Sequence, residues 1–237
     1  MDELLNRTWT EGLTFPVDTK RNLVIDTINA HSYNVAQKDK EFYNALMTCD
    51  ILIPDGVGAV FAMKFLFGKK IKKIAAWDFM VWELERLEKE GGSCFFLGSS
   101  QKVLDLIVKR AAVDYPHIKV GVYSPPYKPV FTDEENAEMI KVVNDFRPDV
   151  LFVGMTAPKQ EKWVASVVDR LDTGHIGCIG ATFDFYAGTV ERAPKWMVDH
   201  SLEWFYRLVR EPKRMWRRYV VGNPKFLWNM LKVKLRG

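Results

Sequence analysis

A strand–helix–strand pattern is written in residues 23–58, which read LVIDTINAHSYNVAQKDKEFYNALMTCDILIPDGVG. Short runs rich in apolar and β-branched side chains occupy residues 23–28 and 50–53, with the length that buried strands have. Between these runs, the apolar residues of 41–48 recur at helical spacing. Two strands joined through a helix form a parallel pair, so this stretch predicts a βαβ unit.

The same alternation continues along the chain. Further strands are predicted at 94–97, 119–122, 150–153 and 175–179, and further helices at 78–90, 101–115, 134–146 and 159–171. Strands that alternate with helices of this length build a sheet covered on both sides. The predicted fold class is therefore α/β, a Rossmann-like and mostly parallel sheet with helices on both faces.

The composition is that of an ordinary globular protein. The chain has 237 residues, of which 48% are hydrophobic and 27% charged, enough for one large domain or one domain with an appendage. No apolar run reaches the roughly 20 residues that cross a bilayer, and residues 1–7 lack a signal peptide, so we expect a cytoplasmic protein. Cys49, Cys94 and Cys178 stand too far apart for a CxxC site and are expected to be reduced and buried.

The charge is unevenly distributed. Residues 201–237 contain ten Lys and Arg against two acids, a net charge of +8, whereas the other 200 residues carry 24 basic and 28 acidic side chains, a net charge of −4. Aromatic residues, among them Trp204, Trp216 and Trp228, stand between the basic ones. We therefore divide the chain into a core over 1–200 and a helical tail over 201–237. Anionic phospholipid surfaces and nucleic acids both fit such a tail.

The tail is predicted to form two helices on either side of a break at Gly222-Asn223-Pro224. Each helix would present an apolar stripe beside Lys and Arg, the pattern of helices that lie in a membrane interface. A solvated surface helix is the alternative interpretation. The apolar residues at helical spacing are Trp204, Phe205 and Leu208 before the break and Phe226, Met230 and Val233 after it.

Polar residues and glycines gather immediately after the predicted strands. The carboxyl ends of parallel strands lie at one edge of a sheet, where ligands bind, so we expect a single site there. Gly, Pro and Asp also end strands as ordinary turn residues, which is the alternative. In chain order the candidates are Thr27, Asn29, Asp55, Gly56, Gly98, Gly154, Lys159, Gln160, Glu161 and Asp184.

Familiar nucleotide and metal motifs are absent from the sequence. There is no GxxxxGK[ST], and Gly56-Val57-Gly58 lacks the third glycine of GxGxxG. The four histidines never stand at HExxH or HxH spacing and no cysteine pair supplements them, so no metal site is predicted. The start of the helix at 159 would offer free N–H groups to a phosphate, although an ordinary surface helix begins in the same way.

Six motifs in a fixed order form a recognisable set. They are Thr27-Ile28-Asn29-Ala30, Leu52-Ile53-Pro54-Asp55-Gly56-Val57-Gly58, Val153-Gly154 with Ala157-Pro158-Lys159-Gln160-Glu161, Phe183-Asp184-Phe185-Tyr186-Ala187-Gly188, Arg192-Ala193-Pro194-Lys195-Trp196-Met197 and Leu202-Glu203-Trp204-Phe205-Tyr206-Arg207-Leu208. With them the chain, from Phe15 onward, resembles the WecG/TagA/CpsF family of bacterial glycosyltransferases, glycosyltransferase family 26.

Three segments depart from the pattern of that family. Lys73-Ile74-Ala75-Ala76-Trp77-Asp78 stands where the family has R-[VI]-x-G-x-D, with Lys for Arg and Ala for Gly. Ala157 replaces the glycine that usually precedes the PKQ motif. The segment from Phe15-Pro16-Val17-Asp18 to Thr27 is short, which leaves little room for a first helix.

The resemblance implies an inverting glycosyltransferase that builds a bacterial cell-surface polysaccharide. It would move a sugar, of N-acetylmannosamine type, a hexuronic acid or a hexose, from a UDP-sugar to a saccharide linked to polyprenyl diphosphate. The UDP-sugar is the donor substrate, and no cofactor or metal is implied. The protein would be cytoplasmic, associated peripherally with the anionic inner face of the cell membrane, and a homo-oligomer is possible.

The resemblance also implies roles for the residues at the strand ends. An inverting transfer needs one base to take the proton of the attacking acceptor hydroxyl. Asp55 is the candidate, with an Asx-turn as its alternative role. Thr27 and Asn29 would bind a sugar or orient the base, with turn and cap roles as their alternatives.

The remaining candidates would bind substrate. Negative charge that grows on the leaving UDP needs protein cations and amides, for which Gln160 and the helix start beside it are candidates. By resemblance, the tail would close over the site and bring Arg207, Arg214 or Arg217 to the diphosphate. Asp184 would contact uridine or be a buried structural residue.

Two other classes of function stay open from the sequence. The first is a nucleic-acid-binding protein that uses the basic aromatic tail, but the polar groups at the strand ends would then have no task. The second is a Rossmann enzyme for another nucleotide such as NAD, which the missing glycine fingerprint disfavours. The predicted partners are therefore a UDP-sugar, a polyprenyl-diphosphate-linked acceptor and an anionic membrane, and not a nucleic acid.

Overall fold

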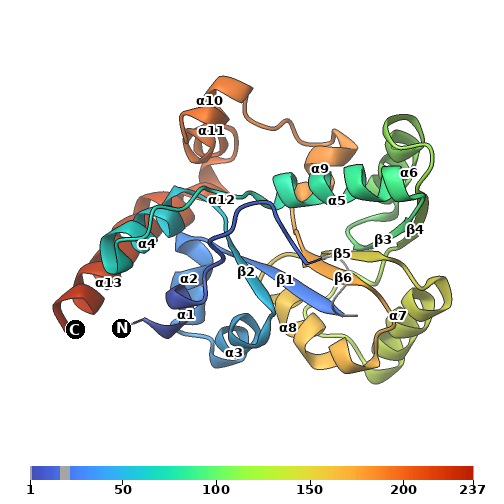
Figure 1. Cartoon of the computed structure of the whole chain (residues 1–237), viewed down its shortest axis with the longest axis horizontal. Coiled ribbons are helices and arrows are strands. Elements are labelled where there is room, and N and C mark those ends of the chain that lie inside the picture. The colour runs from blue at the N-terminus through green and yellow to red at the C-terminus, as the bar shows by residue number, and fades with distance from the viewer. Residues whose placement is uncertain (1, 17–21, 237) are drawn as a thin grey trace.

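Six parallel strands form the sheet of the computed structural model, which describes residues 2–16 and 22–236 (Figure 1). Their order in the sheet is β2-β1-β6-β5-β3-β4, and each pairing between them is parallel. All six predicted strands are confirmed, and their carboxyl ends lie along one edge, which we call the rim. The strands are β1 (Leu23–Ile28), β2 (Ile51–Pro54), β3 (Ser93–Gly98), β4 (Lys119–Tyr123), β5 (Val150–Gly154) and β6 (His175–Cys178).

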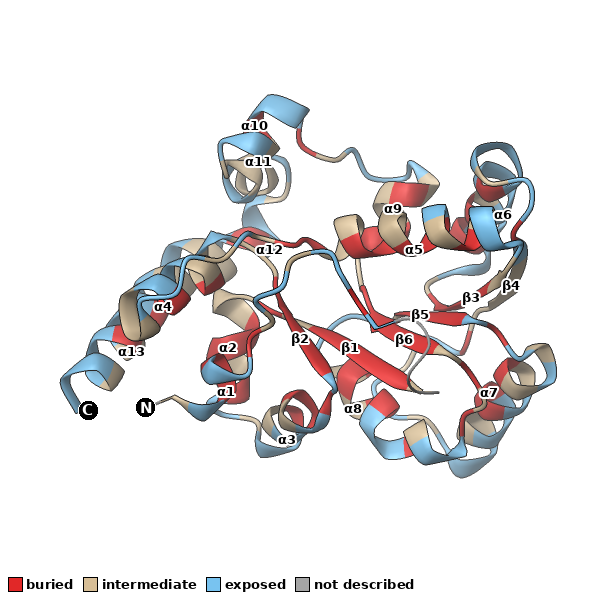
Figure 2. Cartoon of the chain, in the orientation of Figure 1, coloured by how far each residue is buried: buried red, intermediate tan, exposed pale blue. Residues whose placement is uncertain are grey.

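Helices cover both faces of this sheet, as predicted (Figure 1). One face carries α3 (Lys40–Thr48), α7 (Asp133–Phe146) and α8 (Lys159–Val167), and the other carries α5 (Ala76–Glu90), α6 (Gln101–Asp114) and α9 (Thr182–Ala187). Each strand contributes side chains to both faces in alternation, so β5 sends Leu151 to one hydrophobic core and Phe152 to the other. Figure 2 shows the consequence, strands β1, β2, β3, β5 and β6 that are mostly buried beneath helices with exposed outer sides, and an edge strand β4 that is only partly buried.

Several helices were not predicted, and each lacks a clear helical period. They are α1 (Glu3–Asn6), α2 (Ala30–Ala36), α4 (Val57–Phe67), α9 and α10 (Lys195–Asp199). Helix α4 is apolar on nearly every side, and the others are too short for a periodic pattern to stand out. The predicted helix at 159–171 also ends earlier, because α8 tightens after Val167 into a 3₁₀ turn, η1 (Val168–Arg170).

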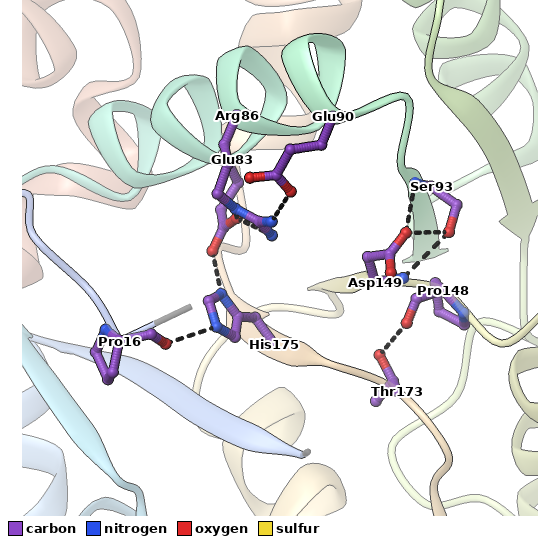
Figure 3. A network of polar contacts seen from close by, with 9 residues as sticks. All are labelled: Pro16, Glu83, Arg86, Glu90, Ser93, Pro148, Asp149, Thr173 and His175. Atoms are coloured by element: carbon purple, nitrogen blue, oxygen red, sulfur yellow. Dashed lines mark hydrogen bonds and ion pairs between the residues drawn. The ribbon is translucent and has the colours of Figure 1, made fainter. Parts of the chain in front are cut away.

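A polar network holds the amino ends of the strands, opposite the rim (Figure 3). His175, the first residue of β6, lies between the carboxylate of Glu83 on α5 and the carbonyl of Pro16, 3.1 Å from its Nε2. Asp149 accepts hydrogen bonds of 2.8 Å from the N–H and the hydroxyl of Ser93. These groups are already satisfied by one another, so His175 is a structural histidine. The short segment noted before Thr27 includes residues 17–21, which lie outside the described residues.

The predicted break at Gly222-Asn223-Pro224 is wrong. After α11 (Glu203–Arg210) the chain bends at Glu211, and α12 (Pro212–Trp216), a π-helical turn η2 (Arg217–Val221) and α13 (Gly222–Arg236) then follow without interruption. Gly222 has right-handed helical angles, φ −71° and ψ −40°. Pro224 lies three residues after the π-helical turn, and the helical run continues through it.

The tail packs on the core beside α2 and α4 (Figure 1). Phe226 and Met230 are buried, and the ring of Phe226 lies 5.3 Å from that of Tyr33 on α2, edge to face. The side chain of Asn34 donates a 2.8 Å hydrogen bond to the carbonyl of Gly222. The stripe of Phe226 and Met230 therefore faces the core. The prediction that this stripe faces a membrane is wrong, because an apolar stripe in the sequence does not indicate which apolar surface will cover it.

Two predictions from composition are confirmed. Cys49, Cys94 and Cys178 are buried and free. Within 2–16 and 22–236, no helix combines the length and apolarity required to cross a membrane. The division at residue 200 stays a prediction.

Candidate active site

Asp55 and Asn29 meet at the rim, where β1 and β2 end side by side. The N–H of Asp55 donates to the carbonyl of Ile28 at 2.9 Å, which holds the turn after β2 against β1. Asn29 caps α2, because its Oδ1 accepts from the N–H groups of His31 and Ser32 at 3.0 Å each. That cap fixes the amide, and its Nδ2 donates to Oδ2 of Asp55 at 3.3 Å. Two of the three predicted catalytic residues are thus in contact.

The surroundings of Asp55 favour a basic carboxylate. Burial raises its pKa, and the negative charge of Glu203 on α11 raises it further. Arg218 on η2, the hydrogen bond from Asn29 and the ammonium of Lys73 act in the opposite direction. The net shift is upward, so this carboxylate holds a proton more readily than an exposed aspartate does, as a general base requires.

Thr27 and Gly56 flank this pair. Thr27 lies on β1, half-buried, in register with Ile53 of β2. Gly56 begins α4 with φ 94° and ψ 161°, a conformation that only glycine adopts without strain. The sharp turn that leaves Asp55 at the rim therefore explains why residue 56 is a glycine.

Arginines of the tail lie across the rim. Arg218 is close enough to act electrostatically on both Asp55 and His31, and it lowers the pKa of His31 to about 4 together with burial, which is the larger cause. The guanidinium of Arg207 lies 5.7 Å from the centre of the Phe185 ring on α9. Burial, and the nearby charges of Arg207 and Arg214, lower the pKa of Arg218. This concentration of positive charge favours the binding of an anion.

Two of these guanidinium groups, and that of Arg192 in the segment before α10, have a donor without a partner. Among the described residues, the buried Nε atoms of Arg192, Arg207 and Arg218 have no hydrogen-bond partner. Arginine donates in a planar fork that matches phosphate oxygens, so such a cluster suits a diphosphate. Of the arginines predicted from the sequence, Arg207 belongs to this cluster.

The other two predicted arginines are exposed, and a contact of either with the diphosphate stays a prediction. Arg217 is exposed, and Arg214 is exposed and pairs with Glu211 at 2.7 Å. Arg218, which was missed, is the tail arginine that acts electrostatically on Asp55, and it lies on the π-helical turn next to the exposed Arg217. Arg192 and Glu203 stand within two of the six motifs, and this was the only sequence signal that could have singled them out. The sequence indicated no role for either residue.

The residues that begin α8 have partners within the protein. The ammonium of Lys159 donates to the carbonyl of Lys128 and lies 3.6 Å from the centre of the Phe131 ring. The N–H groups of Lys159 and Gln160 donate to the carbonyl of Thr156 at 3.0 and 3.3 Å. The helix start therefore offers fewer free N–H groups than expected, and the phosphate-binding roles stay predictions.

Gln160 and Glu161 point into the core. Gln160 is buried, accepts from the N–H of Met155 at 3.2 Å and donates to Oε1 of Glu161 at 2.9 Å. Glu161 is buried near Asp26 of β1, and burial raises the pKa of Glu161 to about 8 and that of Asp26 to about 7. Each carboxyl has one oxygen without a hydrogen-bond partner among the described residues, Oε2 of Glu161 and Oδ1 of Asp26. The pair is therefore protonated in part at neutral pH.

Packing accounts for the two remaining glycines. Gly98 has φ 124°, and a side-chain carbon there would lie 2.5 Å from the carbonyl oxygen of Gly154. A side-chain carbon on Gly154 would lie 2.7 Å from the ring of Phe183. Both glycines allow β3, β5 and α9 to approach closely, and a contact with substrate stays a prediction for each.

Asp184 follows β6 on the first turn of α9 and is half-buried. Its Oδ1 accepts from the hydroxyl of Thr189 at 3.3 Å, and burial raises its pKa while Arg214 opposes that shift. Its uridine contact stays a prediction. In the described ranges, no group of three or more His, Cys, Asp or Glu side chains is arranged as a metal site.

The fold and the rim define a Rossmann-like α/β protein that places a basic carboxylate beneath a cluster of arginines. A family model described as "Glycosyl transferase WecG/TagA/CpsF family" matches residues 7–237, and the chain belongs to this family. The resemblance drawn from the sequence motifs is confirmed, and with it the expectation of a glycosyltransferase at the level of the family.

Curated relatives carry a more specific name. The N-acetylglucosaminyldiphosphoundecaprenol N-acetyl-beta-D-mannosaminyltransferase of Bacillus subtilis (strain 168) is 30% identical over 216 residues, 91% of this chain and 82% of the relative. The protein of the same name from Staphylococcus aureus (strain MW2) is 26% identical over 220 residues, 93% of this chain and 84% of the relative.

Proposed function

We propose that this protein transfers a sugar of N-acetylmannosamine type from a UDP-sugar to a saccharide linked to polyprenyl diphosphate, in the synthesis of a cell-wall polymer. The names of the relatives support both the sugar and the lipid-linked acceptor. The observation that carries the proposal is the contact of Asp55 with Asn29 at a place where the tail arginine Arg218 acts electrostatically on Asp55. One such site contains a base for the acceptor and cations for the leaving group.

The reaction would invert the anomeric carbon in a single displacement. Asp55 takes the proton of the acceptor hydroxyl as its oxygen forms a bond to that carbon, while the bond from the carbon to the UDP oxygen breaks. Asn29 holds the base through Nδ2. Arg207 and Arg218 stabilise the charge that develops on the diphosphate, because their Nε donors are available and partly shielded from water.

The acceptor lipid would bring the protein to the cytoplasmic face of the membrane. The long tail helix exposes large apolar side chains, among them Leu227, Trp228 and Leu231, beside Lys225 and Lys232. Apolar and basic side chains on one surface helix suit an anionic lipid surface. Peripheral association through this tail is thus part of the proposal, and a homo-oligomer stays a prediction.

A calorimetric titration separates this function from its rivals. We expect UDP to bind, and NADH and single-stranded RNA to bind much more weakly or not at all. A panel of radiolabelled UDP-sugars, offered with synthetic polyprenyl-diphosphate acceptors, then identifies the donor. Binding of RNA or NADH in preference to UDP would replace the proposal with one of the two alternatives.

The base is tested by Asp55→Asn, which removes the proton acceptor and keeps the shape. We expect kcat to fall by about 100-fold or more, the scale of general base catalysis, with the dissociation constant of UDP nearly unchanged. Asp184→Asn, at the end of β6, serves as the comparison. Turnover by Asp55→Asn at the rate of the natural protein would remove Asp55 from the mechanism.

A further inference from the structure

Glu203, the first residue of α11, lies between two cations of the core. Its Oε2 is 3.9 Å from Nζ of Lys73, and its Oε1 is 3.9 Å from Nε of Arg192. The three side chains are only 21–24% exposed, so water screens them less than it screens an ordinary surface pair. The ion pairs therefore connect the tail to two separate segments of the body.

One of these segments borders Asp55, and the other borders the start of α5. The N–H of Ile74 donates to the carbonyl of Pro54 at 3.0 Å, which places Lys73 beside the end of β2. The guanidinium of Arg192 lies 5.0 Å from the centre of the Trp77 ring and 3.8 Å from Oδ1 of Asp78 at the start of α5. Glu203 thus completes a chain of charges that runs from α5 to the tail past the base.

Apolar burial does not explain how α11 is attached. None of its eight residues is buried, whereas α13 buries Phe226 and Met230. Polar contacts must then contribute a larger share of the attachment of α11 to the core than they do for α13. Resting on the proposed function, we propose that Glu203 is a positioning residue of the transfer reaction, which fixes the start of α11 beside Asp55 by pairing with Lys73 and Arg192.

The position of Glu203 also affects the base itself. The charged and polar groups that face Asp55 are Glu203 from α11, Arg218 from η2, Asn29 from the cap of α2 and Lys73 from the loop before α5. Glu203 is the negative member of this set and raises the pKa of Asp55. Its removal leaves the cations unopposed, so the pKa of Asp55 falls and the base becomes weaker.

The test compares Glu203→Gln with Glu191→Gln in the full chain. Glu191, the residue before Arg192, contacts α11 on its exposed side, through Arg210 at 2.7 Å and Tyr206 at 3.3 Å, and is 75% exposed. We expect Glu203→Gln to lower kcat/KM about 3- to 10-fold and to move the acid limb of its pH profile to lower pH, as the loss of partly buried ion pairs beside a base predicts. Glu191→Gln should change neither, and Glu203→Asp should restore the acid limb in part. A Glu203→Gln profile with an unmoved acid limb would overturn the proposal.

A second measurement does not depend on turnover. Amide hydrogen exchange over residues 203–210 should become faster in Glu203→Gln and change much less in Glu191→Gln, because the ion pair of the exposed Glu191 contributes little to the attachment of α11. Unchanged exchange in Glu203→Gln overturns the role of Glu203 whatever the activity. If the natural protein transfers no sugar, the proposed function is contradicted instead. Amide hydrogen exchange over residues 203–210 would then still show whether Glu203 attaches α11 to the core.

Discussion

Asn29 uses the two ends of its side-chain amide for different tasks. Its oxygen caps α2, and the nitrogen that remains donates to Asp55. An aspartate would cap the helix about as well as an asparagine does, but it would place a second carboxylate beside the base. The cap and the contact with the base can therefore be separated by substitution.

We predict that Asn29→Asp lowers kcat while Tm stays within about 2 °C of the natural protein, since caps of Asn and Asp are similar in energy. Asn29→Ala loses both contacts, and we expect a lower kcat together with a Tm about 2–4 °C lower, from the loss of about 1 kcal/mol of capping. Activity assays and thermal unfolding measure the two effects. Full activity in Asn29→Asp would show that the contact with Asp55 serves only the fold.

Asp26 and Glu161 make stability depend on pH. Their pKa values are raised by burial to about 7 and about 8, so the folded state favours the protonated forms. In the unfolded chain such carboxyls ionise near pH 4. The stability that they contribute is thus complete below about pH 4 and is lost as the pH rises toward 7 and 8.

We predict that Asp26→Asn removes much of this dependence. The variant keeps a similar shape without a charge, so its free energy of unfolding at pH 8 should exceed that of the natural protein by about 1 kcal/mol or more. Urea unfolding at pH 5 and pH 8 measures the difference, with Asp169→Asn, an exposed site, as the control. Parallel pH dependence in Asp26→Asn and the natural protein would contradict the expectation.

At the scale of elements, the two ends of the tail are attached by different forces. Helix α13 is held by burial of Phe226 and Met230, whereas α11 relies on ion pairs and ring contacts at its surface. Deleting residues 201–237 would remove part of the core, so loss of membrane binding in such a variant would have two explanations. Substitutions on the exposed side of α13 avoid this difficulty.

We predict that reversing the charges of Lys225, Lys232 and Lys234 to Glu weakens binding to anionic liposomes by at least about tenfold, because each basic residue near such a surface contributes about 1 kcal/mol. Transfer to a short-chain soluble acceptor should be retained, since none of these lysines is among the groups that shift the pKa of Asp55. Replacing the 56% exposed Trp228 with Ser should weaken liposome binding as well. Unchanged sedimentation with liposomes would show that α13 is not the membrane anchor.

At the scale of the whole molecule, the core and the tail carry opposite charge. The tail has a net charge of +8 and the remaining chain a net charge of −4. The fold places the tail arginines over the rim, where the core contributes Asp55. The candidate base and the arginine that acts on it electrostatically therefore come from different parts of the chain.

We predict that transfer persists in excess EDTA, because the arginines of the tail would neutralise the leaving diphosphate in place of a divalent ion. The measurement is the rate of transfer with and without EDTA, followed by addition of Mg²⁺ or Mn²⁺. Complete loss on chelation, with recovery on adding a divalent ion, would mean that a metal ion serves the leaving group.

The sequence alone determined the six strands, the parallel sheet and the place of the base. Strands buried on both faces are continuous apolar runs, which can be read locally. Parallel strands all end at one edge, so Asn29 and Asp55 had to lie close together once the strands were assigned. Neither conclusion needs knowledge of how distant segments pack.

Only the tertiary structure decided which charged side chains complete the site. One residue along a helix turns a side chain by about 100°, and Arg218 acts on Asp55 while its neighbour Arg217 is exposed, on a π-helical turn that the sequence does not reveal. The stripe of Phe226 and Met230 had no stated partner until α2 and α4 were seen to cover it. Glu161 turned inward to Asp26, and Glu203 met Lys73 and Arg192, because packing between segments far apart in the sequence sets such pairs.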